Sequence, residues 1–146
     1  MRKVVINTCY GGFDLSYKAV LHYAKLKGIE LYPESEDSIF DLTTFWTLPK
    51  DKRGKILSSS EWEKASLQER KNSNAAHSLA TLYQRDIPRD DPALVKTVED
   101  LGKEANGRFT DLKIVEIPDD VKWHIEEYDG LEHVADRVAL DPRIGV

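Results

Sequence analysis

The first thirty residues alternate between apolar runs and polar turns in a way that predicts a strand, a turn and a helix. Valine and isoleucine dominate residues 2–8, which are predicted to form a buried strand. Apolar residues between 15 and 26 then recur at near-helical spacing, and Gly28 stands where a helix commonly ends. We expect Asp14 or Ser16 to cap the start of this helix.

The middle of the chain has a less regular pattern. Residues 29–32 predict a second short strand, and residues 34–80 are predicted to be an insert that is mobile or partly helical. Within the insert, a serine-rich cap opens a short helix expected over 58–70. The Asn-Ser-Asn run at 72–74 is expected to end that helix.

Regular periodicity returns in the second half. An Asp-Pro pair and an apolar stripe predict a helix over 91–105, because aspartate caps a helix and proline suits its first position. Two strands are predicted over 112–117 and 121–126, and their short connection favours pairing with each other. Residues 131–137 are expected to form a final short helix.

This order of elements indicates an α+β protein. We expect a single domain of residues 1–146, in which a mixed β-sheet is covered by two main helices and which carries the insert at about 34–80. A doubly wound fold fits the order less well, because the connection between the two strands of the second half is short, as in a hairpin.

Composition narrows the class of protein. The 146 residues include 21 Lys and Arg against 26 Asp and Glu, a net charge of −5, which argues against a DNA or RNA binder. No apolar run reaches the roughly 18 residues of a membrane span, and no secretory signal opens the chain. Cys9 is the single cysteine, so an internal disulfide is impossible. We therefore expect a cytoplasmic protein that acts without a membrane.

A glycine pair occupies the turn between the first strand and the first helix. The backbone N–H groups of Gly11 and Gly12 can approach an anion, and the helix start adds a partial positive charge. Tyr10 and Phe13 supply aromatic faces on which a base could stack. The alternative is a tight connection whose aromatic residues cover the core. The turn is not a phosphate loop of the lysine-containing type, and Asp14 places a negative charge beside the supposed anion site.

Three arginines are candidates for binding phosphate, because the guanidinium fork matches phosphate oxygens. Arg85 and Arg89 lie in a charged linker whose aspartates could equally neutralise them as surface ion pairs. Arg108 lies just past the helix predicted over 91–105 and has fewer acidic neighbours.

No pattern of catalytic residues stands out. Cys9 could be a nucleophile at a helix start, but none of the four histidines lies in a catalytic signature, which favours an inert buried cysteine. The acidic pairs at 119–120 and 126–127 are read as solvated turn or strand residues. The histidine spacing fits no zinc site. We predict no catalytic residue, no metal and no cofactor.

Five blocks of sequence carry a resemblance to a known family. They are Val4–Phe13, Ile87–Pro92, Ala105–Phe109, Leu112–Val121 and Ile125–Gly130. Across roughly 1–30 and 83–136 the chain resembles the first Thoeris anti-defence family of phage proteins. It departs from the family pattern at Asp14, in the 34–80 insert, and at residues 138–146, which lack a basic and aromatic tail.

The resemblance implies a sponge rather than an enzyme. Thoeris defence makes a cyclic ADP-ribose isomer during infection, and the sponge binds this messenger in the host cytoplasm without degrading it, so the effector stays inactive. Members of the family form homo-oligomers. The ligand contacts expected for such a nucleotide are Tyr10, Gly11, Gly12, Phe13, Arg89, Asn106 and Arg108. The aromatic residues would stack on the base, the arginines would hold phosphate, and the asparagine would read a ribose hydroxyl or a base edge.

Three alternatives remain open at the level of sequence. The ligand could be a cyclic oligonucleotide of the CBASS type, which some members bind at separate sites. The protein could be a small nucleotide-hydrolysing enzyme that uses Cys9 or Asp120. It could also be an inhibitor that docks on a host protein through residues 40–46.

Overall fold

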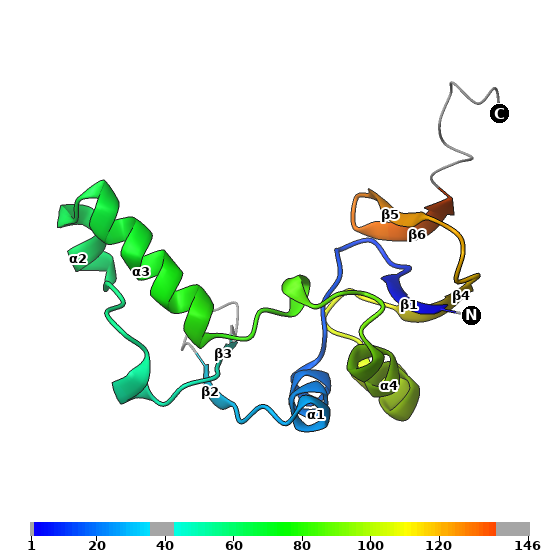
Figure 1. The fold of residues 1–146 in the computed structure, drawn as a ribbon, viewed down its shortest axis with the longest axis horizontal. Coiled ribbons are helices and arrows are strands. Elements are labelled where there is room, and N and C mark those ends of the chain that lie inside the picture. Colours follow the sequence, from blue (N-terminus) through cyan, green and yellow to red (C-terminus); the bar gives the residue numbers. More distant parts are fainter. Residues whose placement is uncertain (1, 36–42, 137–146) are drawn as a thin grey trace, which may run out of the picture. The chain divides into compact units, whose positions relative to one another are not determined.

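The computed structural model describes residues 2–35 and 43–136, which form two compact units (Figure 1). One unit contains the residues up to Lys27 and from Gln84 onward, and the other contains Gly28–Tyr83. Helices and small antiparallel sheets make up both units, so the predicted α+β class is confirmed. The expected insert falls within the second unit. The expectations for Phe40 and for residues 138–146 lie outside the described residues.

The first unit is built around two strands that come from opposite ends of the chain. β1 (Arg2–Asn7) pairs antiparallel with β4 (Leu112–Ile117), and Val4 lies opposite Val115. Both strands match their predicted positions. The predicted mixed sheet is wrong, because the described strands form three separate two-stranded antiparallel sheets.

Two helices cover one face of this strand pair. α1 (Tyr17–Lys27) packs against α4 (Pro92–Leu101), and α4 contacts both β1 and β4. The predicted caps are confirmed: Ser16 Oγ accepts the Ala19 N–H at 3.1 Å, and Asp91 Oδ1 accepts the Ala93 N–H at 2.8 Å. The helix predicted over 91–105 is shorter than expected: α4 ends at Leu101, and Gly102–Ala105 form a 3₁₀ turn.

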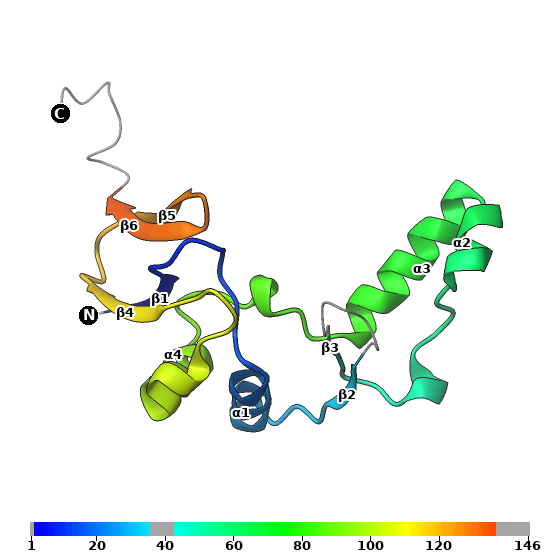
Figure 2. The same cartoon turned by 180° about the vertical axis from the view of Figure 1, so that it is seen from behind.

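A β-hairpin covers the other face, as the front and back views both show (Figures 1 and 2). β5 (Trp123–Tyr128) and β6 (Leu131–Asp136) pair antiparallel through the two-residue turn Asp129–Gly130. Two predictions are therefore wrong. Residues 131–136 of the expected final helix form strand β6, and the strand after the Pro118 turn pairs with β6 instead of with residues 112–117. Both turn residues have positive φ, 52° and 90°, which is the geometry that favours Asp-Gly in tight hairpins.

The core of the first unit lies on both faces of β1 and β4. Val4, Ile6 and Ile117 are buried beneath the hairpin and pack against a partly buried set that includes Val115, Val121, Trp123, Ile125 and Val134. Val5 lies on the opposite face by strand alternation, on the side of the helices, where Leu94 is also fully buried. A lone strand pair is marginal in water, so covering both faces stabilises it.

The second unit joins a short hairpin to two helices. β2 (Tyr32–Ser35) pairs with β3 (Thr43–Trp46), and α2 (Ser59–Lys64) and α3 (Leu67–Ala80) follow a 3₁₀ turn at Lys50–Lys52. The short strand expected at 29–32 lies later, at β2. Within the described residues of the whole chain, no helix is long and apolar enough to cross a membrane.

The single helix expected over 58–70 is in fact two helices. Ser58 and Ser66 each form a complete capping box, with Glu61 and Glu69 respectively, so a second start signal divides the segment. The Asn-Ser-Asn run does not end the helix as predicted. It lies inside α3, where the buried Ser73 hydroxyl accepts the Leu57 N–H at 2.9 Å.

A buried carboxylate links α1 to α4. The Tyr23 hydroxyl donates to Asp91 Oδ2 at 2.7 Å, and Lys27 Nζ lies 3.4 Å from the same oxygen. Burial alone would raise the pKa of Asp91, but hydrogen bonds from Tyr23 and Ala93 and the charge of Lys27 outweigh it and lower the pKa. Burial, followed by the hydrogen bond to Asp91, raises the pKa of Tyr23.

Asp91→Asn should make the protein less stable at neutral pH and less sensitive to acid. Because the folded state lowers the pKa of Asp91, its stabilisation is present above the unfolded-state pKa of about 3.9 and is lost as the pH falls through the lower folded value. The amide still caps α4 but loses the charge, so we expect a loss of about 1–2 kcal/mol at pH 7. Urea unfolding from pH 7 to pH 2 measures this, with Asp86→Asn, an exposed linker position, as control. The prediction is contradicted if the free energy of unfolding falls by the same amount between pH 7 and pH 2 in wild type and in Asp91→Asn.

Candidate functional site

A hollow of about 490 Å³ opens beside the turn that follows β1. We call it the glycine hollow. It is lined by Tyr10, Gly11, Gly12, Arg85, Glu127, Asp129 and Gly130. All of these residues belong to the first unit, and they come from the β1–α1 turn, the 3₁₀ turn Gln84–Asp86 and the tip of the β5–β6 hairpin. The volume lies within the roughly 300–1,000 Å³ typical of small-molecule sites.

Backbone segments meet at the floor of the glycine hollow without side chains between them. A Cβ atom on Gly11 would lie 2.8 Å from Phe109 Cβ, and one on Gly130 would overlap the amide nitrogens of Gly11 and Gly12. The Gly11 N–H donates to the Asp129 carbonyl at 3.3 Å. Close packing therefore requires these glycines whether or not a ligand binds, as the tight-connection alternative expects.

Asn7 holds these segments together at the end of β1. Its side chain is fully buried, and Nδ2 donates to the carbonyls of Cys9 at 2.7 Å and Gly130 at 2.8 Å. Oδ1 accepts the N–H groups of Cys9 at 3.1 Å and Asp111 at 3.0 Å. One amide side chain thus satisfies two donors and two acceptors, which fixes the turn against the hairpin tip.

Charges of both signs surround the opening. The exposed Arg85 extends toward Gly12, with Nη2 3.4 Å from where a Cβ of that residue would lie. Glu127 and Asp129 are also exposed, and Glu127 Oε1 accepts the Gly130 N–H at 3.1 Å. Tyr10 is 58% exposed, so its ring is accessible at the rim. The hollow therefore offers a cation, two carboxylates and an aromatic face.

The expected contacts Arg89 and Phe13 lie together, but in the interior. Arg89 forms a two-pronged ion pair with Glu132, Nη1 to Oε1 at 2.5 Å and Nη2 to Oε2 at 2.8 Å. Its guanidinium carbon lies 3.6 Å from the centroid of the Phe13 ring, which is only 3% exposed. Neither side chain is available to a ligand, because the arginine is neutralised by Glu132 and the ring is buried.

Asn106 also has a structural position. Its Oδ1 accepts the Leu112 N–H at 2.8 Å, and its backbone forms a bridge with Leu15. Arg108 is different, since its guanidinium carbon lies 5.3 Å from the centroid of the exposed Phe109 ring. Neither Arg108 nor Phe109 lines the glycine hollow, but the backbone of Phe109 lies beside Gly11, which does.

The structure therefore brings together only part of the predicted set. Tyr10, Gly11 and Gly12 meet Arg85, which was one of the three arginines considered for phosphate but was not among the expected ligand contacts. The hairpin tip, with Asp129 and Gly130, was missed. The sequence did contain a signal for this tip, because an Asp-Gly pair flanked by alternating apolar and polar residues predicts the tight turn of a β-hairpin.

The residues that line the glycine hollow include no cysteine or histidine. Cys9 is half-buried, and both of its backbone groups bond to Asn7. Glu126 bridges His124 and His133 on the hairpin at 3.2 and 3.0 Å. Within residues 2–35 and 43–136, no group of three or more His, Cys, Asp or Glu side chains could hold a metal ion.

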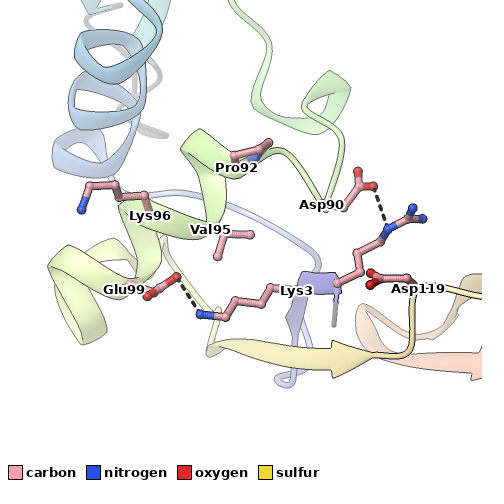
Figure 3. A pocket seen from close by; sticks show the side chains of 8 residues that line it. Lys3, Asp90, Pro92, Val95, Lys96, Glu99 and Asp119 are labelled. Carbon is pink, nitrogen blue, oxygen red and sulfur yellow. Dashed lines mark hydrogen bonds and ion pairs between the residues drawn. The ribbon is translucent and has the colours of Figure 1, made fainter.

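A second hollow, of about 480 Å³, lies between β1 and α4 (Figure 3). Arg2 faces Asp90 at 3.9 Å, and Lys3 faces Glu99 at 3.4 Å. In each pair the two opposite charges neutralise each other, and both pairs are partly exposed. Val95 lies between the two pairs (Figure 3). Arg2 and Lys3 are thus already paired with carboxylates, whereas Arg85 at the glycine hollow forms no ion pair with another described residue.

Comparison with known proteins gives no relative of this chain. No protein-family profile, no curated protein and no solved structure matches it. The chemistry of the glycine hollow therefore has to be inferred from the residues that line it.

Glu132→Gln should destabilise the protein strongly. Removing one charge of a buried pair leaves the other uncompensated, which typically costs about 3–5 kcal/mol, and Glu132 also accepts the Asn7 N–H at 2.8 Å. Urea unfolding at pH 7 measures this loss. The control is Glu104→Gln, which breaks the exposed pair with Lys18 and should change stability by less than about 1 kcal/mol. Equal effects of the two variants would contradict the prediction.

Proposed function

We propose that the protein binds and sequesters a nucleotide of the cyclic ADP-ribose type in the glycine hollow without degrading it. In the setting implied by the sequence resemblance, it would be a phage anti-defence protein that withholds the messenger from the Thoeris effector in the host cytoplasm. The observation that carries the proposal is the meeting of an exposed tyrosine ring and an exposed arginine across the bare backbone of Gly11 and Gly12.

Arg85 is the group suited to phosphate. Unlike Arg89, it forms no ion pair with another described residue, so its guanidinium fork is available for two phosphate oxygens. The glycine backbone opposite it allows close approach, because no side chain stands at Gly12. A pyrophosphate at this position would meet positive charge despite the negative charge of the whole chain.

The two carboxylates are suited to ribose. A carboxylate accepts hydrogen bonds from vicinal hydroxyl groups, and dinucleotide-binding proteins use an acidic residue in this way. Glu127 and Asp129 are exposed at the hairpin tip on the rim of the same hollow. A ligand with both phosphate and ribose therefore uses both signs of charge, whereas inorganic phosphate alone would be repelled by the acids.

A binding role fits the residues better than a catalytic one. The residues that line the glycine hollow include neither the cysteine nor the histidine of the common Cys–His and Ser–His catalytic pairs. Sequestration requires only affinity. Rigid backbone contacts around Asn7 would limit the entropy cost of binding.

Purified protein should bind a cyclic ADP-ribose isomer and release it intact. Calorimetry with cyclic ADP-ribose isomers and with cyclic trinucleotides identifies the ligand, and mass spectrometry after heat denaturation tests its integrity. Sedimentation measures whether the complex is the expected homo-oligomer. A ligand of altered mass would make the protein an enzyme, and binding of trinucleotides alone would favour the CBASS-type alternative. Absence of binding to any of these nucleotides would overturn the proposal.

Arg85→Ala should weaken nucleotide binding by about 10- to 150-fold, which corresponds to losing one charge-assisted hydrogen-bonded contact of about 1.5–3 kcal/mol. Arg2→Ala removes an arginine of the same unit that lies outside the glycine hollow, so it should bind as wild type does. Thermal unfolding of both variants checks that neither has lost its fold. Equal affinity of Arg85→Ala and wild type would contradict the role of Arg85.

A further inference from the structure

Phe109 adopts a backbone conformation that bulky residues rarely have. Its φ is +62°, in the left-handed region where a Cβ crowds the following carbonyl group. Its side chain is 68% exposed, so the ring gains little from burial. A phenylalanine here is unfavourable for the backbone and does not contribute to the core.

The turn that fixes this conformation does not use the ring. Thr110 donates to the Gly107 carbonyl through its N–H at 3.3 Å and through its hydroxyl at 2.8 Å. A Cβ atom on Gly11 would lie 2.8 Å from both the carbonyl oxygen and the Cβ of Phe109, so the two residues lie side by side. Glycine or asparagine would satisfy the same contacts with less backbone strain, so the fold alone gives no reason for an aromatic residue.

The neighbouring arginine makes the ring part of a larger surface. The Arg108 guanidinium carbon lies 5.3 Å from the centroid of the Phe109 ring, within the range of cation–π contact. Aromatic and guanidinium planes are the groups on which proteins stack exposed bases. The pair adjoins the glycine hollow, because Gly11 both lines the hollow and contacts Phe109.

We infer that Phe109, flanked by Arg108, is a stacking platform for a planar purine ring at the margin of the glycine hollow. This inference rests on the proposed function for the identity of the full ligand. It gives the base a partner that the buried Phe13 cannot provide. The phosphate would lie at Arg85 and the base on Phe109, on either side of Gly11.

Nuclear magnetic resonance of ring-labelled phenylalanine tests the platform directly. The chain has four phenylalanines, so the spectrum is simple, and Phe109→Leu assigns the relevant signals. Titration with adenosine monophosphate should shift the Phe109 ring signals upfield through the ring current of the base. The Phe13 signals should not move, because that ring is buried. A titration to millimolar concentration without movement of Phe109 would overturn the inference, whether or not the protein is a sponge.

Binding measurements separate this inference from the proposed function. Phe109→Leu should bind the cyclic nucleotide about 5- to 150-fold more weakly, the equivalent of one base stacked on an aromatic ring. It should bind ribose 5-phosphate, which has a phosphate and a ribose but no base, as wild type does, whereas Arg85→Ala should bind both ligands more weakly. If Phe109→Leu keeps full nucleotide affinity while Arg85→Ala loses it, the platform is wrong and the proposed function stands. If adenosine monophosphate shifts Phe109 but no cyclic nucleotide binds tightly, the proposed function fails and the platform stands.

A glycine variant separates a binding role from a structural one. Phe109→Gly relieves the positive-φ strain, so its thermal midpoint should equal or exceed that of wild type, while nucleotide affinity falls as in Phe109→Leu. Loss of the folded state in Phe109→Gly would show that the ring is structural and would overturn the inference.

Discussion

The ion pair between Arg89 and Glu132 is the interaction on which the first unit depends. It joins the segment before α4 to strand β6, across the outer edge of β1. The Val5 N–H donates to the Arg89 carbonyl at 2.8 Å, and the Asn7 N–H donates to Glu132. The edge that β1 presents away from β4 is thus satisfied by a loop backbone and a carboxylate instead of a third strand. Without the Glu132 carboxylate, the buried Asn7 N–H would lose its acceptor, and an unsatisfied buried donor is costly.

The same pair decides where a ligand could bind. It neutralises Arg89, whose guanidinium lies over the Phe13 ring, so one side chain of the segment before α4 and one of the β1–α1 turn are unavailable to a ligand. Arg85, four residues earlier in the chain, stays exposed because it has no such partner in the described structure. The positive charge available at the glycine turn therefore comes from Arg85, which has no buried carboxylate partner in the described structure.

The two units differ in how they are stabilised. In the described part of the second unit, Trp46 and Ala80 are the buried apolar residues. The Arg53 guanidinium lies 3.9 Å from the Trp46 ring, and two capping boxes fix the helix starts. The second unit is thus stabilised mainly by local hydrogen bonds and a cation–π contact, whereas the first unit is stabilised by a hydrophobic core. Neither hollow depends on the second unit, because both are lined by residues of the first.

Local signals in the sequence determined the elements whose cause is local. The valine-rich strand β1, the caps at Ser16 and Asp91, and the α+β class follow from propensity, capping and periodicity over a few residues. The helix expected at 131–137 is wrong because the i, i+3 spacing of Leu131 and Val134 resembles a helical face. The Asp129–Gly130 turn instead folds residues 131–136 back onto β5, and this pairing with another segment determines their structure.

Tertiary structure alone decided the pairing of the strands and the composition of the candidate site. The pairing of β1 with β4 joins residues more than a hundred positions apart, and no short-range pattern encodes it. Whether an arginine faces solvent or a buried carboxylate depends on Glu132, which is 43 residues from Arg89 in the chain. The sequence by itself thus determined which residue types the glycine turn holds, whereas only the fold decided which charges lie beside it, because long-range packing selects the partner of each charge.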